Sequence, residues 1–343
     1  MQNLMQNLNY GKVHVFHDAP LNFTAIIAIH SLKNGTSLGG CRCLPYNSFE
    51  QALTDALNLG HAMTQKSKMH NLNYGGGKSV IMYPEKTQQR AEIFKKFGHY
   101  INSLNGEYIA AEDSGSSQQD MENIAETSNF VLATSILKNN NVNCNPSKYT
   151  AQGVLQAILG ANQYIFGNQS LANKSFIIQG LGAVGMLLAQ QIFNLGGKLY
   201  INDTDEERIK LASQQFSAIC INEQQLASTP ADYFVPCALG GVLTKKLCQN
   251  IQTKFIIGAA NNQFTTPLEH IKILQQRNIH WIPDFLCNGG GLIHVNQQYG
   301  NLDENFIELK ILAIKQKTIN ILTKLNKHKI PMDQAINEII REQ

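Results

Sequence analysis

Two lysines stand in settings where an ammonium group could do chemistry. Lys66 lies three residues after Met63 and seven after Leu59, so on a helix it would share a face with apolar side chains. Lys78 directly follows three glycines, residues 75–77, which let a backbone approach a ligand and present the next side chain at a cleft. A buried lysine can act as an acid or base near neutral pH. The alternative is that Lys66 caps a helix and Lys78 lies at the edge of a strand, with both ammonium groups in solvent.

A carboxylate that could work with these lysines follows an apolar segment. Residues 108–111 have the composition of a strand, and Glu112 and Asp113 come directly after them, before a Ser114-Gly115 turn. A carboxylate at the end of such a strand often lies at a cleft, whereas an aspartate there can equally cap a helix. The residues alone leave both interpretations open for Asp113.

A glycine pattern typical of dinucleotide binding, Gly-Leu-Gly-Ala-Val-Gly, occupies residues 180–185. It follows a predicted strand, residues 175–179, and precedes a predicted helix that extends to Ile192. The first glycine would make the tight turn, the second would let the backbone touch a pyrophosphate, and the third would permit close helix–strand packing. The helix N-terminus would offer N–H groups to the phosphates. Cofactor binding is therefore expected at Gly180, Gly182, Ala183, Val184 and Gly185.

The acidic residue after the next strand bears on which dinucleotide binds. Residues 198–202 form a predicted strand, and Asp203 follows it, eighteen residues beyond Gly185. Its carboxylate would bind the hydroxyls of the adenine ribose and repel a 2′-phosphate. Three further carboxylates precede the first arginine, Arg208. This pattern favours NAD over NADP.

Composition excludes several classes of function. The net charge of +3 is not concentrated in a run, so neither nucleic acid nor a membrane surface is expected as a partner. No apolar stretch reaches membrane-spanning length, and residues 1–10 lack the pattern of a secretory signal. The seven cysteines form no zinc-ligand cluster. We therefore expect no metal and a cytoplasmic location.

The elements that would position these residues follow from hydrophobic periodicity. Ser48 is the predicted N-cap of a helix that continues to Lys66. Strands are predicted at residues 13–16, 23–30, 79–83 and 130–134. An Asn-rich, proline-containing linker at residues 138–146 precedes an alternation of strands and helices, which indicates a parallel sheet with helices on both faces.

The chain is long enough, at 343 residues, for two domains with separate cores. We predict an α/β protein with an N-terminal substrate-binding, catalytic and oligomerisation domain in residues 1–133. A Rossmann-type, doubly wound NAD-binding domain is predicted in residues 134–324. The helices of residues 325–343 are expected to pack back on the N-terminal domain.

Taken together, the motifs resemble those of the amino acid dehydrogenases of the glutamate, leucine, phenylalanine and valine family, and most of all its leucine dehydrogenase branch. The resemblance covers nearly the whole chain. Besides the dinucleotide glycines it rests on residues 38–42 (LGGCR), 63–66 (MTQK), 75–78 (GGGK), 111–113 (AED), 150–153 (TAQG), 236–240 (PCALG), 258–262 (GAANN) and 288–291 (NGGG).

This resemblance implies roles for particular residues. Lys66 would bind the substrate α-carboxylate, helped by Gly40 and by an asparagine of the 261–262 pair, taken as Asn262. Lys78 would be the catalytic lysine, with a pKa lowered by burial and nearby positive charge, and would activate the water that attacks the imine carbon. Asp113 would carry protons to and from the substrate nitrogen. Further cofactor contacts are implied for Thr150, Ala238 and Asn261.

The resemblance also implies which residues line the substrate side-chain pocket. These are Leu38, Met63, Ala111, Thr134, Leu292 and Val295. None is charged, so a glutamate side chain would meet no cation. Aromatic-specific relatives tend to carry glycine in place of Ala111, which favours a branched aliphatic substrate here. Leu292 favours a phenylalanine or tryptophan substrate instead, because leucine is found there in relatives acting on those amino acids.

The implied reaction is NAD-dependent, reversible oxidative deamination of an apolar L-amino acid, leucine or another branched-chain one preferred, to the 2-oxo acid and ammonia. The family implies a homo-oligomer, a dimer or larger.

Phenylalanine- or tryptophan-type activity stays open. A catalytically silent NAD-binding paralogue, acting as sensor or assembly protein, is the alternative from another class. Intact Lys66, Lys78 and Asp113 argue against it. A hydroxy-acid dehydrogenase is a further alternative, but no histidine has the expected cleft setting.

Overall fold

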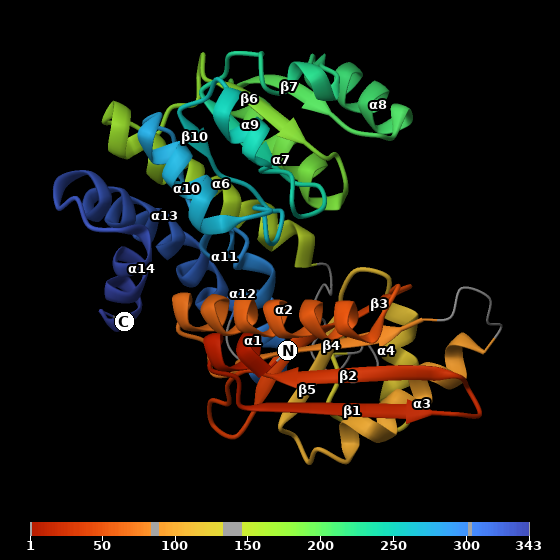
Figure 1. Ribbon diagram of the computed structural model, residues 1–343. Helices are drawn as coiled ribbons and strands as arrows, with labels where there is room; N and C mark the ends of the chain where they lie inside the picture. The colour runs from red at the N-terminus through yellow and green to blue at the C-terminus, as the bar shows by residue number, and fades with distance from the viewer. Residues whose placement is uncertain (1, 84–88, 133–145, 301–303, 343) are drawn as a thin grey trace. The chain divides into compact units, whose positions relative to one another are not determined.

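The computed structural model describes residues 2–83, 89–132, 146–300 and 304–342 (Figure 1). The chain divides into two compact units. Unit 1 comprises Met1–Cys144 and Gln298–Leu302, and unit 2 comprises Asn145–Gln297 and Asp303–Gln343. The domain boundary expected at residues 133 and 134 lies outside the described residues, as does the expected linker up to residue 145. The expected end of a strand at residues 133–134 lies outside them too.

Unit 1 contains a mixed five-stranded sheet in the order β1-β2-β4-β3-β5. Strands β1, β2 and β4 pair antiparallel, whereas β3 lies parallel to both β4 and β5. The strands are β1 (Lys12–Asp18), β2 (Phe23–Ile29), β3 (Ser37–Leu44), β4 (Gly75–Met82) and β5 (Tyr108–Glu112). Because β3 lies between β4 and β5, side chains from β4 and β5 can meet only across it.

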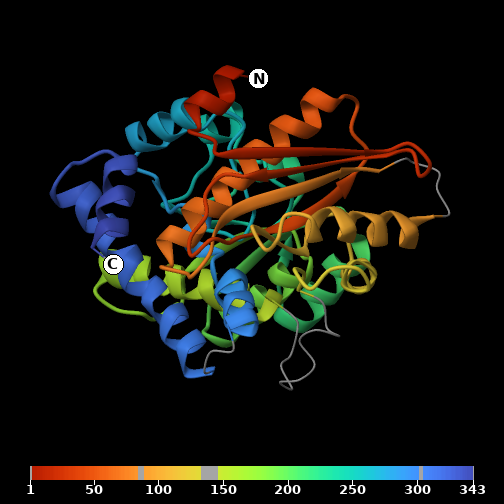
Figure 2. The same cartoon turned by 90° about the horizontal axis from the view of Figure 1, so that it is seen from below.

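Helices cover both faces of this sheet (Figures 1 and 2). The helices of unit 1 are α1 (Gln2–Asn7), α2 (Phe49–Met69), α3 (Arg90–Asn102) and α4 (Gln118–Ala125). Apolar residues of α2 pack on Ile26, Ala28 and Val80, while α3 and α4 pack on the opposite face, around Ile27 and Ile81. The N-cap prediction is confirmed, because the Ser48 side chain accepts a hydrogen bond from the Gln51 N–H.

Glycine-rich segments form strand β3 and the first residues of β4, neither of which the sequence predicted. Residues 37–44 form β3, and β4 begins at Gly75, before the strand predicted at residues 79–83. A Cβ on Gly39 would lie 1.9 Å from the Gly77 carbonyl oxygen, and one on Gly76 would lie 2.1 Å from the Thr64 nitrogen. The glycines therefore allow close backbone approach within the sheet and beneath α2, although glycine weakens an isolated strand.

Unit 2 contains a six-stranded, wholly parallel sheet in the order β11-β10-β9-β6-β7-β8. Its strands are β6 (Ser175–Gln179), β7 (Lys198–Asn202), β8 (Ile219–Cys220), β9 (Tyr233–Pro236), β10 (Phe255–Ile256) and β11 (His280–Trp281). Counted along the chain, this is the 3-2-1-4-5-6 order of dinucleotide-binding folds, with the switch point between β6 and β9. The predicted α/β class with a doubly wound second domain is confirmed.

The helices of unit 2 connect these strands and complete its C-terminal part. They are α6 (Pro146–Phe166), α7 (Ala183–Asn194), α8 (Glu206–Phe216), the 3-10 turn η2 (Glu223–Gln225), α9 (Lys245–Asn250), α10 (Pro267–Gln276), α11 (Asp284–Cys287), α12 (Gly290–Gly300), α13 (Glu304–Lys327) and α14 (Met332–Arg341). Helix α6 packs on α13 within the unit.

The C-terminal helices are grouped differently from the expectation. Residues 325–343, expected to join the N-terminal domain, are grouped with unit 2. The physical reason is that Lys324 of α13 pairs at 2.8 Å with both Glu338 and Glu342 from the α14 region. These contacts, with the buried Ala335 and Ile339, hold α14 against α13.

Candidate active site

A lysine–carboxylate pair forms the centre of the candidate site in unit 1. The Nζ of Lys78 lies 2.6 Å from Oδ2 of Asp113. Lys78 comes from the middle of β4, is only 5% exposed, and reaches Asp113 at the end of β5. Asp113 is held by its backbone, because its N–H donates to the Ser116 hydroxyl, which in turn donates to the Asp113 carbonyl. Asp113 is not the cap of the following helix, because Ser117 is the N-cap of α4, and a cleft position for Asp113 stays a prediction.

The pair can form because the intervening strand has no side chain at the crossing point. In the β3–β4 register Leu38 pairs with Gly76 and Cys41 with Ser79, so Gly40 is opposite Lys78. A Cβ on Gly40 would lie 2.7 Å from the Asp113 Cβ and 3.1 Å from the Lys78 Nζ. The first distance is too short for a Cβ atom, and the second is tighter than an ordinary contact. Gly40 therefore provides the space in which the ammonium and carboxylate meet.

Arg42 extends the pair into a chain of charges that the sequence did not reveal. Its Nε donates to Asp113 Oδ2 at 3.2 Å, and its Nη1 donates to Asp55 Oδ2 at 3.0 Å. The Tyr46 hydroxyl donates to the same Asp55 oxygen at 2.7 Å. The sequence does hold one signal for Asp55: its spacing from Met63 and Lys66 places all three residues on one side of a helix.

The electrostatic balance keeps Asp113 ionised. Burial of the Asp113 carboxyl opposes ionisation, but the Lys78 ammonium and the Arg42 guanidinium outweigh it and hold the pKa of Asp113 below its ordinary value. The protein therefore presents a carboxylate, a hydrogen-bond and proton acceptor, on a largely buried surface. Such a group can take a proton from a bound ammonium.

Lys66 lies on the side of α2 that faces β3. Asp55 lies on that same side and bonds to Arg42 of β3. Residues 59, 63 and 66 follow Asp55 at helical spacing, so they also lie on this side of α2. Lys66 is half-buried there. A second ammonium group on this side is consistent with a carboxylate-binding role, which stays a prediction.

Several predicted pocket residues share the sheet face that carries Lys78. Leu38 precedes Gly40 by two positions on β3, and Ala111 is opposite Gly40 in the β3–β5 register. Because side chains alternate along a strand, both point to the same face as Lys78 and Asp113. Met63 is half-buried on the side of α2 described above. Thr134 lies outside the described residues.

The predicted dinucleotide turn has the required geometry in unit 2. Gly180 has φ +96°, and a Cβ there would lie 2.6 Å from the Ala238 nitrogen at the end of β9. A Cβ on Gly185 would lie 2.0 Å from the Gly180 carbonyl oxygen. Gly182 is the N-cap of α7, and nothing lies within 4 Å of its Cβ position. The turn therefore leaves open space above a helix N-terminus at the switch point, where a phosphate fits.

Asp203 is fixed beside this turn. Its carboxylate accepts hydrogen bonds from the Leu181 N–H and the Asp205 N–H, the latter at 2.9 Å. Partial burial opposes ionisation, but these two N–H groups hold the pKa of Asp203 below its ordinary value. Arg208, the first arginine after Asp203, pairs with Asp205 at 3.1 Å. The charge beside the turn is therefore set by a carboxylate.

The other residues predicted to contact the cofactor belong to unit 2. A Cβ on Gly291, at the start of α12, would lie 2.6 Å from the Thr150 hydroxyl, so Thr150 abuts the glycine-rich end of that helix. Asn288 donates to the Asn261 side chain at 2.8 Å. The Asn288 Oδ1 is buried and, among the described residues, has no hydrogen-bond partner. Such an acceptor fits the amide N–H of a nicotinamide carboxamide.

Three predicted substrate residues also belong to unit 2. Asn262 has φ +51°, and its N–H donates to Asp284 at 2.7 Å. Leu292 and Val295 are half-buried on α12. Their part in a substrate pocket stays a prediction.

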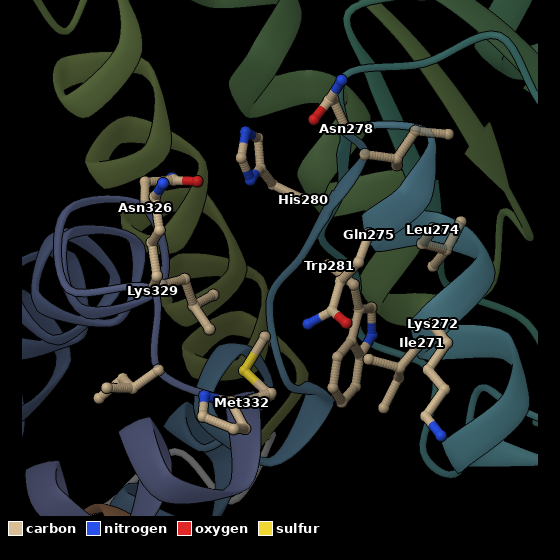
Figure 3. A pocket seen from close by; sticks show the side chains of 14 residues that line it. Ile271, Lys272, Leu274, Gln275, Asn278, His280, Trp281, Asn326, Lys329 and Met332 are labelled. Carbon is tan, nitrogen blue, oxygen red and sulfur yellow. The ribbon is translucent and has the colours of Figure 1, made fainter.

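None of these residues lines a cavity of about 520 Å³ in unit 2, whose lining side chains are shown in Figure 3. It is lined by α10, the segment leading into β11, and the connection between α13 and α14, including Lys272, Trp281 and Met332. The α10–β11 connection enters β11 at its amino end, whereas doubly wound sheets bind ligands at the carboxyl ends of their strands. This cavity is therefore not the dinucleotide site.

None of the helices in the described parts of the chain is long and apolar enough to cross a membrane. Within the same residues, no group of three or more His, Cys, Asp or Glu side chains is arranged to hold a metal ion.

Known proteins match parts of both units. A family model described as "Glu/Leu/Phe/Val dehydrogenase, dimerisation domain" matches residues 12–130, and one described as "Glutamate/Leucine/Phenylalanine/Valine dehydrogenase" matches residues 200–297. The leucine dehydrogenase of Geobacillus stearothermophilus is 34% identical over 339 residues, covering 98% of this chain and 91% of that protein.

The chain belongs to the Glu/Leu/Phe/Val dehydrogenase family. Another member, the phenylalanine dehydrogenase of Caldalkalibacillus thermarum (strain TA2.A1), is 32% identical over 338 residues, covering 97% of this chain and 90% of that protein. The crystal structure of L-tryptophan dehydrogenase from Nostoc punctiforme matches with a TM-score of 0.83 and 28% identity, covering 100% of this chain and 98% of that one. The family comprises NAD(P)-dependent amino acid dehydrogenases, so membership supports an oxidoreductase.

Proposed function

We propose that the protein catalyses NAD-dependent, reversible oxidative deamination of an apolar L-amino acid, with leucine or another branched-chain amino acid preferred. The products are the 2-oxo acid and ammonia. The observation that carries this proposal is the Lys78–Asp113 pair, joined at 2.6 Å across Gly40. A buried ammonium beside an ionised carboxylate supplies the acid and the base that deamination needs.

The cofactor would be held by residues of unit 2. The open N-terminus of α7 suits the pyrophosphate, Asp203 suits the ribose hydroxyls, and the buried Asn288 acceptor suits the carboxamide. Thr150, Ala238 and Asn261 complete the proposed contacts. When bound, NAD supplies the two-electron oxidant, and the remaining tasks fall to the side chains of the protein.

Each of those tasks has a proposed residue. Lys66, with Gly40 and Asn262, binds the substrate α-carboxylate. Asp113 accepts a proton from the substrate ammonium group, because it is ionised and still partly exposed. After the substrate is oxidised, Lys78 in its neutral amine form takes a proton from the water that attacks the imine carbon. The ammonium so formed stabilises the oxygen of the adduct, which breaks down to the 2-oxo acid and ammonia. In the reverse direction Asp113 returns the proton to nitrogen.

A panel of L-amino acids, assayed by NADH or NADPH formation with NAD and NADP side by side, tests the proposed function. We expect turnover with leucine, isoleucine and valine and none with glutamate, because no charged residue is among the proposed pocket residues. Highest activity with phenylalanine or tryptophan would favour the second candidate, which the presence of Leu292 and the similarity to phenylalanine and tryptophan dehydrogenases support. Absence of turnover with every amino acid would favour a silent NAD-binding paralogue.

The preference for NAD should depend on the charge of Asp203. In Asp203→Asn, we expect the ratio of kcat/KM with NAD to kcat/KM with NADP to fall about tenfold, roughly 1.4 kcal/mol of lost discrimination. The reason is that the variant no longer repels a 2′-phosphate, and it also binds the ribose hydroxyls less well. Steady-state kinetics with both cofactors measures this ratio. The exposed Glu223 of the same unit, changed to glutamine, is the control; an equal fall there, or an unchanged ratio in Asp203→Asn, would refute the role of Asp203.

Substrate size should depend on Ala111. In Ala111→Gly, we expect kcat/KM for phenylalanine relative to leucine to rise about tenfold, because one methylene-sized change in an apolar pocket is worth about 1–3 kcal/mol. The control is Ala110→Gly, whose side chain packs in the core on the opposite face of the same strand. Competition assays on mixed substrates give the ratio directly. If both variants change it equally, Ala111 does not line the pocket.

We also propose that the protein is a homo-oligomer, a dimer or larger. Support comes from the family model over residues 12–130, whose description names a dimerisation domain. A cytoplasmic location remains part of the proposal.

A further inference from the structure

We propose that Arg42 is a positioning residue that holds the Asp113 carboxylate in its working orientation by tying it to Asp55 on α2. This inference rests on the proposed function, because it concerns how the proton acceptor of that reaction is held. The proposal goes beyond the substrate-binding and catalytic residues discussed above, since Arg42 is not required to contact substrate or cofactor.

The contacts of Arg42 define a fixed bridge between a strand and a helix. One edge of the guanidinium meets Asp113 Oδ2 at 3.2 Å, and Nη1 meets both Asp55 oxygens, at 3.0 and 3.3 Å. Tyr46 holds Asp55 from the other side at 2.7 Å. The planar fork of arginine bonds two carboxylates in set directions, which a single ammonium group cannot do.

Among the described residues, the two cations that contact Asp113 bind the same carboxylate oxygen. Lys78 Nζ approaches Oδ2 from β4, and Arg42 Nε approaches it from β3. Two cations at fixed positions restrict rotation of the carboxylate about its Cβ–Cγ bond. Arg42 lies two residues after Gly40 on the same strand face, so the bridge is built next to the crossing point of the pair.

The charges of the groups around Asp113 determine which of them can change its pKa. The titratable groups that interact electrostatically with it are Lys78 on β4, Arg42 and Cys41 on β3, Tyr46 after β3, and Tyr108 on β5, with Asp55 of α2 one contact beyond. Burial raises the pKa values of Cys41, Tyr46 and Tyr108 above their ordinary ranges, so these three stay neutral. Lys78 and Arg42 are therefore the cations that favour the ionised form of Asp113.

The variant Arg42→Gln tests the proposal through the pH dependence of deamination. The pKa of Asp113 in the folded protein lies below its ordinary value partly because of Arg42, so removing that charge raises it. The acid limb of kcat/KM, measured from about pH 3 to 8 because the wild-type limb lies in the acidic range, should then move to higher pH by about one unit. We also expect kcat at pH 8 to fall about tenfold or more, since the carboxylate is no longer oriented.

Two companion variants separate positioning from general damage. Arg42→Lys restores one positive charge, so its acid limb should return towards that of the wild type while kcat stays reduced. Arg277→Gln removes an arginine that donates to the Cys248 and Ile251 carbonyls in unit 2, and its acid limb should match the wild type. An unmoved acid limb in Arg42→Gln, or an equal shift in Arg277→Gln, would overturn the proposal.

A second measurement distinguishes failure of this inference from failure of the proposed function. Should the wild type turn over no amino acid, the proposed function fails, and the coupling of Arg42 to Asp113 is read from stability instead. Urea unfolding of the wild type, Arg42→Gln, Asp113→Asn and the double variant at pH 7 forms a double-mutant cycle. Effects that are clearly non-additive support the bridge, and additive effects refute it.

Discussion

Replacing Lys78 with alanine should lower kcat for deamination by about 10³-fold while leaving the Kd for NAD unchanged. The expected loss is the size of an acid–base contribution by one positioned side chain. Lys78 is the buried member of the pair, and among the described residues it is the only lysine in an ion pair with Asp113. The proposed NAD-binding residues belong to unit 2, which has its own sheet.

The measurement combines steady-state kinetics with NAD titration followed by calorimetry. Lys12→Ala is the matched control, because Lys12 is an exposed lysine of the same unit that pairs with Glu107. Removing Lys78 leaves Asp113 paired with Arg42, so its carboxylate is not stranded without a cation. Circular dichroism checks that the variant is folded. A folded Lys78→Ala protein with wild-type kcat would remove Lys78 from the proposed mechanism.

Replacing Gly40 with alanine should lower kcat/KM by about 10²-fold, although the change adds a single methyl group. The new carbon would lie 2.7 Å from the Asp113 Cβ and 3.1 Å from the Lys78 Nζ. Asp113 or Lys78 must therefore move, and a displacement of about 1 Å in a catalytic group can reduce rate 10²-fold. NAD binding should be unaffected, because Gly40 belongs to unit 1.

The control for this variant is Gly11→Ala in the same unit. A Cβ on Gly11 would lie 3.5 Å from the nearest atom, the Ile29 carbonyl oxygen, which is an ordinary contact. We expect Gly11→Ala to keep wild-type kcat/KM. Equal activity of the two variants would mean that the space beside Gly40 does not matter for catalysis.

Local signals in the sequence predicted much of the fold. The helix after Ser48 could be predicted because capping and 3.6-residue periodicity act within a few residues. The dinucleotide turn was equally local, since a glycine with positive φ, a strand before it and a helix after it are contiguous. The position of Asp203 could also be predicted, because it directly follows the next strand.

Other features could not be predicted from local patterns. Two glycines at positions 39 and 40 argue against a strand, yet β3 is central, because its neighbours β4 and β5 approach too closely for side chains. The grouping of residues 325–343 with unit 2 depends on ion pairs between Lys324 and the α14 region, which periodicity does not reveal.

By itself, the sequence determined which chemical groups the protein has and the local elements that carry them: the lysine after three glycines, the aspartate after an apolar strand, and the glycine turn before Asp203. Only the tertiary structure decided that Lys78 meets Asp113 across Gly40, and that Arg42 ties Asp113 to Asp55. The physical reason is separation along the chain. Arg42 and Asp113 are 71 positions apart, and their contact exists only because strand pairing brings β3 and β5 side by side.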